Sequence, residues 1–414
     1  MDTKTLRCGL LGRKLGHSYS PAIHERLADY SYRLFEVEPE DLGAFLQEGG
    51  FDGLNVTIPY KKDVIPYCAE LSDTARAIGA VNTLVRRADG TLWGDNTDAY
   101  GFSMLVQSSG ADVAGKKALV FGSGGASATA QYVLRRLGAR EVVVISRHGE
   151  DNYENLDRHA DAQIAVNTTP VGMYPNTGVS PVDLHRLPRL EAALDVVYNP
   201  ARTEFLLQAE ARGLRRANGL LMLAAQAKKS CEDFTGEPVD DAKIFSITKA
   251  LEAQMHNVIL IGMPGSGKTT IGTLVAKRLG RTFVDADSAL EREAGMPIPE
   301  IFRREGEAGF RRRETAVLAE LGRQSGLVLA TGGGSVTREE NYPLLHQNGE
   351  IFCLQRALER LPSAGRPVSQ ALGAQTIYAQ RKPLYARFAD AMIDNNGTPE
   401  AAAAQILEVL GCSC

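Results

Sequence analysis

The chain has 414 residues, of which 44% are hydrophobic and 23% are charged, and its formal net charge is −4. Domains usually run to roughly 100–200 residues, so this length predicts two or three folding units with more than one apolar core. The charge excludes a strongly basic chain of the kind that binds nucleic acid or anionic membranes, so local basic residues must hold any anionic substrate.

No segment reaches the roughly 18 apolar residues of a membrane-spanning helix, and the N-terminus lacks the apolar run of a signal peptide. The six cysteines are scattered without a C-x-x-C pair, which favours reduced thiols. A metal site or bridge at Cys412 and Cys414 is the less favoured alternative, because chain ends usually fray. We therefore expect a cytoplasmic protein without nucleic-acid or membrane partners, whose oligomeric state, a homodimer included, stays open.

Strands alternate with helices along the chain, which is typical of α/β folds with parallel sheets. The first expected elements are a strand over Leu6–Leu11, helices over Ala22–Tyr30 and Asp41–Glu48, and a strand over Gly53–Ile58.

Four clusters of polar residues beside turn formers occur among these elements. They are Gly16–Pro21, Asn55–Lys61, Gly79–Thr83 and Gly94–Asp98. Each alone is explained by a turn or a cap, and Asn96–Asp98 is best explained as a helix cap if it is taken by itself. A bare nucleotide-binding domain needs none of the four, so together they predict a polar site.

A β-α-β unit follows, with a strand over Lys117–Phe121, a helix over Ala126–Leu137 and a strand over Glu141–Ser146. Between the first strand and the helix lies Gly122-Ser-Gly124-Gly125, a variant of the dinucleotide-binding fingerprint with Ser127 in place of the third glycine. This arrangement predicts a Rossmann-like cofactor domain.

The end of the second strand bears on which nicotinamide cofactor is bound. Ser146 and Arg147 stand where an NAD-binding domain carries an acidic residue, and an arginine there suits the 2′-phosphate of NADP. We expect NADP, with NAD as the alternative. The segment from Arg147 to Ala165 is short, which predicts that a helix is missing.

Residues 7–235 resemble shikimate dehydrogenase, on these clusters and on the late motif Gly219-Leu-Leu-Met-Leu-Ala-Ala-Gln226. The resemblance implies that Lys61 and Asp98 form the catalytic pair, and either could transfer the proton. His17 is a rival to this pair, but a role in shaping its turn is favoured. The resemblance also implies substrate-binding residues, namely Ser18 and Ser20 for the carboxylate, Thr57, Asn82 and Gln226 for the ring hydroxyls, and Tyr198. The cofactor-binding residues that it implies are Gly122, Gly124, Gly125, Ala126, Ser146 and Arg147.

A second glycine-rich loop follows a strand over Asn257–Ile261 and precedes a helix over Thr270–Leu279. Its sequence, Gly262-Met-Pro-Gly265-Ser266-Gly267-Lys268-Thr269, matches G-x-x-x-x-G-K-[ST] in the strand–loop–helix context that this motif requires. Backbone N–H groups and Lys268 would hold the phosphates of ATP or GTP, and the Thr269 hydroxyl would bind Mg²⁺.

The motifs beyond this loop identify the acceptor. Asp285 and Asp287 end a strand and place two carboxylates on one side of it. Gly309–Glu314 begins a helix whose first turn is basic. Gly332–Gly334 follows another strand and has no side chains, which would allow a ligand to approach closely. For Arg312 and Arg313, a solvated helix face is the preferred explanation.

Residues 257–394 resemble shikimate kinase, with Arg366-Pro-Val where the family has R-P-L. The resemblance implies that Asp287 holds the acceptor hydroxyl as a base and that Asp285 holds Mg²⁺ through water beside Thr269. Arg311 and Arg381 would bind the shikimate carboxylate, and Gly332, Gly333 and Gly334 would contact the ring. The ATP-binding residues implied are Gly262, Gly265, Ser266, Gly267, Lys268, Thr269, Thr270, Arg360 near adenine, and Arg366 in a lid at about 361–373.

The expected domains are therefore a substrate-binding domain over 1–105, completed by a C-terminal helix at about 219–245, a Rossmann-like NADP domain over 106–218, and a P-loop kinase domain over 254–414. The last would be an α/β domain like the nucleoside monophosphate kinases, with a parallel sheet. The two resemblances imply NADPH-dependent reduction of 3-dehydroshikimate and ATP-dependent phosphorylation of shikimate. The alternatives are a shikimate- or quinate-binding sensor, a quinate dehydrogenase, or a different small-molecule kinase.

Overall fold

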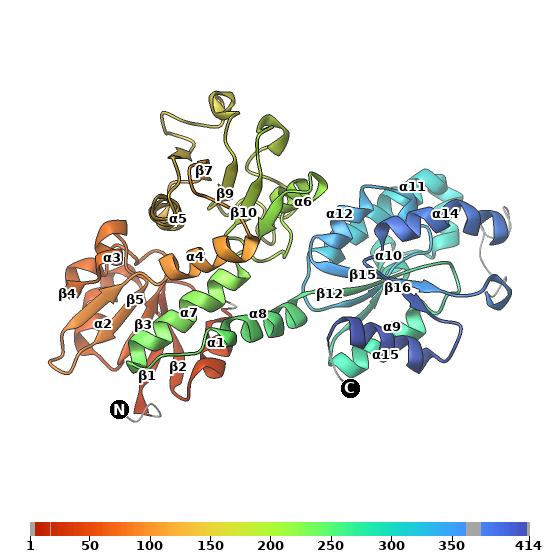
Figure 1. Cartoon of the computed structure of the whole chain (residues 1–414). Helices are drawn as coiled ribbons and strands as arrows, with labels where there is room; N and C mark the ends of the chain where they lie inside the picture. The colour runs from red at the N-terminus through yellow and green to blue at the C-terminus, as the bar shows by residue number, and fades with distance from the viewer. Residues whose placement is uncertain (1–4, 17, 362–373, 412–414) are drawn as a thin grey trace. The chain divides into compact units, whose positions relative to one another are not determined.

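A computed structural model of the chain describes residues 5–16, 18–361 and 374–411 (Figure 1). The chain divides into two compact units. The first contains residues 1–172, 179–198 and 205–250, and the second contains residues 173–178, 199–204 and 251–414. The main division falls inside the helix α8 (Ala242–Met255).

The first part of unit 1 is a six-stranded sheet with helices. Its elements are β1 (Arg7–Gly12), α1 (Ser20–Leu27), β2 (Ser31–Glu36), α2 (Leu42–Glu48), β3 (Gly53–Val56), β4 (Cys68–Leu71), α3 (Asp73–Ile78), β5 (Thr83–Arg86), β6 (Leu92–Asp95) and α4 (Asp98–Ser109). The strand order is β2-β1-β3-β5-β6-β4. The expectation of parallel strands is wrong in the middle of this sheet, because β5 is antiparallel to both β3 and β6. A tight turn joins β5 to β6, and such a turn can connect only antiparallel strands.

The second part of unit 1 is a five-stranded parallel sheet in the order β11-β10-β9-β7-β8. Its elements are β7 (Lys117–Phe121), α5 (Gly125–Arg136), β8 (Glu141–Ile145), β9 (Ile164–Asn167), β10 (Ala192–Asp195), α6 (Glu204–Ala211) and β11 (Arg215–Ala217), followed by α7 (Leu220–Thr235). The prediction of a missing helix is confirmed: between β8 and β9 the chain forms one 3₁₀ turn, η4 (Leu156–His159), and no α-helix.

Unit 2 contains a five-stranded parallel sheet in the order β13-β14-β12-β15-β16, which confirms the α/β class with a parallel sheet. Its elements are β12 (Asn257–Ile261), α9 (Lys268–Leu279), β13 (Phe283–Asp285), α10 (Ala286–Ala294), α11 (Ile298–Gly322), β14 (Val328–Ala330), α12 (Asn341–His346), β15 (Gly349–Gln355), α14 (Ala374–Phe388), β16 (Ala391–Asp394) and α15 (Pro399–Val409). Short 3₁₀ turns complete the two units.

The central strand of unit 2 shows why the sheet is covered on both faces. Val258 and Leu260 belong to one buried cluster, whereas Ile259 and Ile261 belong to another. Successive side chains on a strand point to opposite faces, so a strand with four apolar residues in a row buries both of its faces. The strand β7 in unit 1 divides its side chains between two clusters in the same way.

Two expected helices differ in the structure. The helix α1 begins at Ser20, with Pro21 in its first turn, and ends at Leu27 because Ala28 is extended. The helix that carries Arg311 does not begin at Gly309. It is the second segment of α11, which is kinked at Gly306, where φ is 67° and ψ is −176°.

No helix within the described ranges is both long and apolar enough to cross a membrane. The four cysteines that the structure describes, Cys8, Cys68, Cys231 and Cys353, are free.

The helix α7 packs against α4 and α1 of the first sheet domain, although it follows the second domain in the chain. Gly101 in α4 permits this close approach: a Cβ atom there would lie 2.6 Å from the Met222 carbonyl oxygen and 3.1 Å from the Gln226 Cβ. The absence of a side chain at Gly101 therefore lets α4 and α7 pack closely. This packing places the side chains of α7 beside the first sheet.

The substitution Gly101→Ala should lower the free energy of unfolding of unit 1. Overpacking against backbone costs about 1–3 kcal/mol, which outweighs the roughly 1 kcal/mol that alanine gains over glycine inside a helix. Urea unfolding monitored by circular dichroism measures the difference, with Ser103→Ala on the same helix as the control. A Gly101→Ala variant more stable than the original chain would contradict the close packing.

Candidate active sites

A cavity of about 280 Å³ in unit 1 collects the residues that the sequence predicts for the first site. Those that line it are Ser18, Ser20, Thr57, Lys61, Asn82, Asp98, Tyr198 and Gln226. They come from the loop before α1 and the first residue of that helix, the segment after β3, the loop before β5, the first residue of α4, the loop after β10 and the helix α7. His17 lies outside the described residues.

The catalytic pair predicted from the sequence is an ion pair in this cavity. Lys61 Nζ donates to Asp98 Oδ2 at 2.5 Å, and the two side chains are 24% and 12% exposed. Asp98 is the first residue of α4, where the helix dipole favours a carboxylate. Its other oxygen accepts from Asn82 Nδ2 at 2.9 Å. The pair is therefore oriented from both sides and still open to a ligand.

A buried network of hydroxyl and amide groups lies behind this pair. Ser230 Oγ, on α7, accepts from Asn55 Nδ2 at 2.7 Å and lies 2.9 Å from both Thr83 Oγ1 and Thr97 Oγ1. Thr97 Oγ1 in turn accepts a hydrogen bond from Asn82 Nδ2 at 3.0 Å. The network connects α7, which carries Gln226, to the residues that hold Asp98.

Sequence reasoning gave no role to Ser230. It lies four residues after Gln226 in a helix, so the two share a face, and this spacing was the available signal.

The predicted cofactor loop lies next to this cavity. Gly122 has φ of 106°, and a Cβ atom there would lie 2.9 Å from Thr168 Oγ1. Gly124 caps α5, and a Cβ atom on Gly125 would lie 3.9 Å from Lys61 Cδ. The bare N-terminus of α5, continued by Ala126, therefore suits a pyrophosphate at a short distance from the ion pair.

Ser146 and Arg147 follow β8, which is parallel to β7 with Ile145 opposite Phe121. Both residues therefore leave the same edge of the sheet as the glycine loop. Arg147 is exposed, so its guanidinium is available to a phosphate at this edge. Ser127 is fully buried in α5, where the fingerprint has its third glycine, and its small side chain fits that packing.

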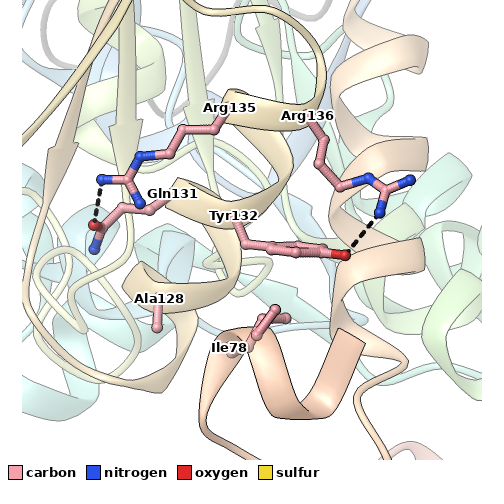
Figure 2. A pocket seen from close by; sticks show the side chains of 7 residues that line it. Ile78, Ala128, Gln131, Tyr132, Arg135 and Arg136 are labelled. Carbon is pink, nitrogen blue, oxygen red and sulfur yellow. Dashed lines mark hydrogen bonds between the residues drawn. The ribbon is translucent and has the colours of Figure 1, made fainter. Parts of the chain in front are cut away.

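Another cavity, of about 460 Å³, lies between α3 and α5 and contains none of the predicted site residues (Figure 2). Arg135 donates to Gln131 Oε1 at 3.2 Å and Arg136 donates to Tyr132 Oη at 2.9 Å, so each guanidinium bonds to its own helix. The cavity is open to solvent and lacks a group suited to proton or phosphoryl transfer.

The phosphate loop of unit 2 is wound as its motif predicts. Gly262, Gly265 and Gly267 have φ of 143°, 83° and 96°, values that glycine adopts without strain. Lys268 Nζ donates to the carbonyl oxygens of Gly262 and Met263 at 2.9 and 3.1 Å. The lysine thus lies over its own loop. Ser266 is buried just before the helix, and Thr270 lies in the first turn of α9.

The two residues predicted to hold Mg²⁺ lie together, since Thr269 Oγ1 donates to Asp285 Oδ2 at 2.9 Å. A hydroxyl and a carboxylate are the hard oxygen ligands that this ion prefers, so the residues fit it. The other oxygen of Asp285 caps α10 and is thereby fixed.

Asp287 lies beside this pair and has the electrostatics of a proton acceptor. Burial raises its pKa to about 6, and the neighbouring carboxylates of Asp285 and Glu314 act in the same direction. A carboxylate with such a pKa can accept a proton from a hydroxyl that is held against it.

The predicted acceptor-binding arginines surround the three glycines. Arg311 Nη1 donates to Glu314 Oε2 at 2.7 Å, and Arg381 Nη1 donates to the Gly333 carbonyl at 2.9 Å. A Cβ atom on Gly334 would lie 2.4 Å from Arg311 Nη2, and one on Gly332 would lie 2.8 Å from Asp287 Oδ1. Bare backbone is therefore what allows these side chains to converge.

Sequence reasoning missed two further residues here. Glu314 orients Arg311, and Tyr385 donates to the Gly333 carbonyl at 2.6 Å. Glu314 ends the motif Gly309–Glu314 and Tyr385 lies four residues after Arg381, but sequence position does not state which side chains touch each other.

The remaining arginines predicted for unit 2 have different outcomes. Arg360 donates to the Asn396 carbonyl, whereas Arg366 and the lid lie outside the described residues. Arg312 is exposed, and the Arg313 side chain, which is 37% exposed, pairs with Glu305 at 2.9 Å, so both are compatible with the predicted solvated helix face.

Comparison with known proteins gives similarities to each part of the chain. The family model of the shikimate dehydrogenase substrate binding domain matches residues 10–84, and the shikimate kinase family model matches residues 264–411. A shikimate dehydrogenase (NADP(+)) of Clostridium perfringens is 36% identical in an alignment of 267 residues that covers 59% of this chain and 98% of that protein.

Two solved structures extend the similarity. The shikimate 5-dehydrogenase of Thermus thermophilus, in complex with NADP(H) and shikimate, is 32% identical with a TM-score of 0.55, over 59% of this chain and 99% of that chain. A quinate dehydrogenase of Corynebacterium glutamicum, in complex with NAD, is 27% identical with a TM-score of 0.55, over 60% of this chain and 98% of that chain.

Replacing Ser230 with alanine should destabilise unit 1, because the Asn55 amide loses its acceptor at 2.7 Å and is left with Thr83 Oγ1 at 3.4 Å. We expect a loss of about 1–3 kcal/mol, the cost of an unsatisfied buried polar group. Urea unfolding measures it, and the exposed Ser246→Ala is the matched control. Equal unfolding free energies for the two variants would show that the hydrogen bonds of Ser230 do not stabilise unit 1.

Proposed function

Because the chain belongs to the shikimate dehydrogenase family and carries a shikimate kinase domain behind that part, we propose that it catalyses two successive reactions of the shikimate pathway. The first is the NADPH-dependent reduction of 3-dehydroshikimate to shikimate. The second is the ATP-dependent phosphorylation of shikimate to shikimate 3-phosphate. The observation that carries the proposal is that, in each half, predicted reactive groups lie together beside a glycine-rich loop suited to phosphate.

The first reaction needs a hydride delivered to the carbonyl carbon and a proton delivered to the carbonyl oxygen. NADPH supplies the hydride when it is bound. Lys61 and Asp98 lie in the cavity 2.5 Å apart and hold a proton between them, next to the glycine loop. Asn82 fixes the Asp98 carboxylate. Ser18 and Ser20 would bind the substrate carboxylate, and Thr57, Gln226 and Tyr198 would orient the ring.

The second reaction depends on positioning and on neutralising charge more than on covalent chemistry. ATP supplies the phosphoryl group when it is bound with Mg²⁺. Asp287 would take the proton from the acceptor hydroxyl, and its raised pKa suits that role. Arg311 and Arg381 would hold the shikimate carboxylate with guanidinium groups, which bind carboxylates in two-pronged geometry.

Two alternatives differ in what they require of the site. A sensor would not need reactive groups, yet Lys61, Asp98 and Lys268 are all present in bonded geometry. The similarity to a quinate dehydrogenase supports quinate as the substrate of the first site. The Ser18/Ser20 pair supports shikimate instead. A cytoplasmic location and a homodimer stay predictions.

The variants Lys61→Ala and Lys268→Ala should separate the two activities. Losing Lys61 removes the proton donor or its partner, so NADPH oxidation should fall by about 10²–10⁴-fold while phosphorylation persists. Losing Lys268 should abolish phosphorylation alone. Absorbance at 340 nm with 3-dehydroshikimate, and ADP release with shikimate, measure the two reactions.

The exposed lysines Lys62 and Lys277 provide matched alanine controls, which should leave both reactions unchanged. If either active-site variant abolished both reactions while the chain stayed folded, the proposal that the two active sites work independently would be wrong.

The phosphorylation reaction should lose activity in mild acid. Asp287 must be ionised to accept a proton, and because its pKa is raised to about 6, kcat/KM for ATP should fall below that pH by about tenfold per pH unit. An ordinary carboxyl group would place this fall near pH 4. A profile that stays flat from pH 7 to pH 5 would rule out Asp287 as the base.

A further inference from the structure

Arg356 follows β15 at the edge of the sheet where the phosphate loop leaves β12. The two strands are parallel neighbours with Ile261 opposite Cys353, so the residues after each emerge side by side. A Cβ atom on Gly262 would lie 2.8 Å from the Leu354 carbonyl oxygen, which shows how close the loop is to the end of β15.

The guanidinium of Arg356 lies beside the last glycine of the loop. A Cβ atom on Gly267 would lie 4.0 Å from Arg356 Nη1. The same glycine is flanked by Asn395, whose amide donates to the Ser266 carbonyl at 2.5 Å. Arg356 therefore stands at the N-terminus of α9, where backbone N–H groups face a bound phosphate.

Arg356 differs from Arg311 and Arg381 in having no hydrogen-bond acceptor. Its Nε is buried without a hydrogen-bond partner, and across the described ranges its side chain makes no ion pair or hydrogen bond. Arg311 bonds to Glu314, and Arg381 bonds to the Gly333 carbonyl. A half-buried cation without an anion is costly, and a ligand that supplies the anion removes the cost.

We propose that Arg356 binds the phosphate chain of the nucleotide, as a second cation beside Lys268. The inference rests on the proposed ATP-dependent reaction and adds a residue to its site. A guanidinium can donate two parallel hydrogen bonds to phosphate oxygens, whereas the ammonium of Lys268 acts as a point charge. The ligand is a nucleoside di- or triphosphate, because Arg356 lies against the phosphate loop.

The test compares Arg356→Met, which keeps an unbranched apolar stem but removes the guanidinium and its charge, with Arg356→Lys and with the exposed Arg278→Met at the other end of α9. Calorimetry gives the Kd of Mg-ADP on the full chain, and the phosphorylation assay gives KM for ATP and for shikimate. We expect Arg356→Met to weaken Mg-ADP binding and raise KM for ATP by roughly tenfold to a hundredfold. KM for shikimate should stay within about twofold, and Arg356→Lys should recover part of the loss.

The inference is overturned if Arg356→Met binds Mg-ADP as tightly as Arg278→Met does, or if KM for ATP and for shikimate rise together. Should the methionine variant fail to fold, Arg356→Gln takes its place with the same criteria. Failure of the proposed function looks different, because the original chain would then bind no Mg-ADP and phosphorylate no shikimate.

Discussion

Binding phosphate groups against bare backbone is the constraint on which both halves of this chain are built. The net charge is −4, so anionic ligands are not drawn by the chain as a whole. Each half instead places a glycine loop between a buried parallel strand and a helix, β7 and α5 in one and β12 and α9 in the other. Glycines at positive φ, such as Gly122 and Gly267, turn N–H groups toward the ligand.

The reactive groups differ between the halves, but each is held by partners that come from distant parts of the chain. Asp98 is fixed by Asn82 and by the hydroxyl network that ends on Ser230. Asp287 lies against Gly332, where any side chain would collide with it. In both cases the position of the carboxylate depends on tertiary packing between elements that are distant in the sequence. The same contacts therefore stabilise the fold and orient the reactive group.

The sequence predicted what is local and could not predict what is distant. The two glycine loops, the short segment before β9 and the residues lining the first cavity follow from motifs read along the chain. Ser230 was missed because its amide partner, Asn55, lies 175 residues away. The antiparallel strand β5, the end of α1 at Leu27 and the kink at Gly306 were missed for a related reason: tertiary contacts and a single backbone torsion decide them.

The central claim is that one half produces the molecule that the other half consumes. The most direct measurement gives the purified chain 3-dehydroshikimate, ATP, Mg²⁺ and NADPH, with NADH in a parallel sample, and follows 340 nm absorbance together with ADP. The account predicts that NADPH is consumed first and that ADP appears after a lag and reaches the same total. ADP formed without NADPH oxidation, or no reduction with either coenzyme while shikimate still binds, would contradict it.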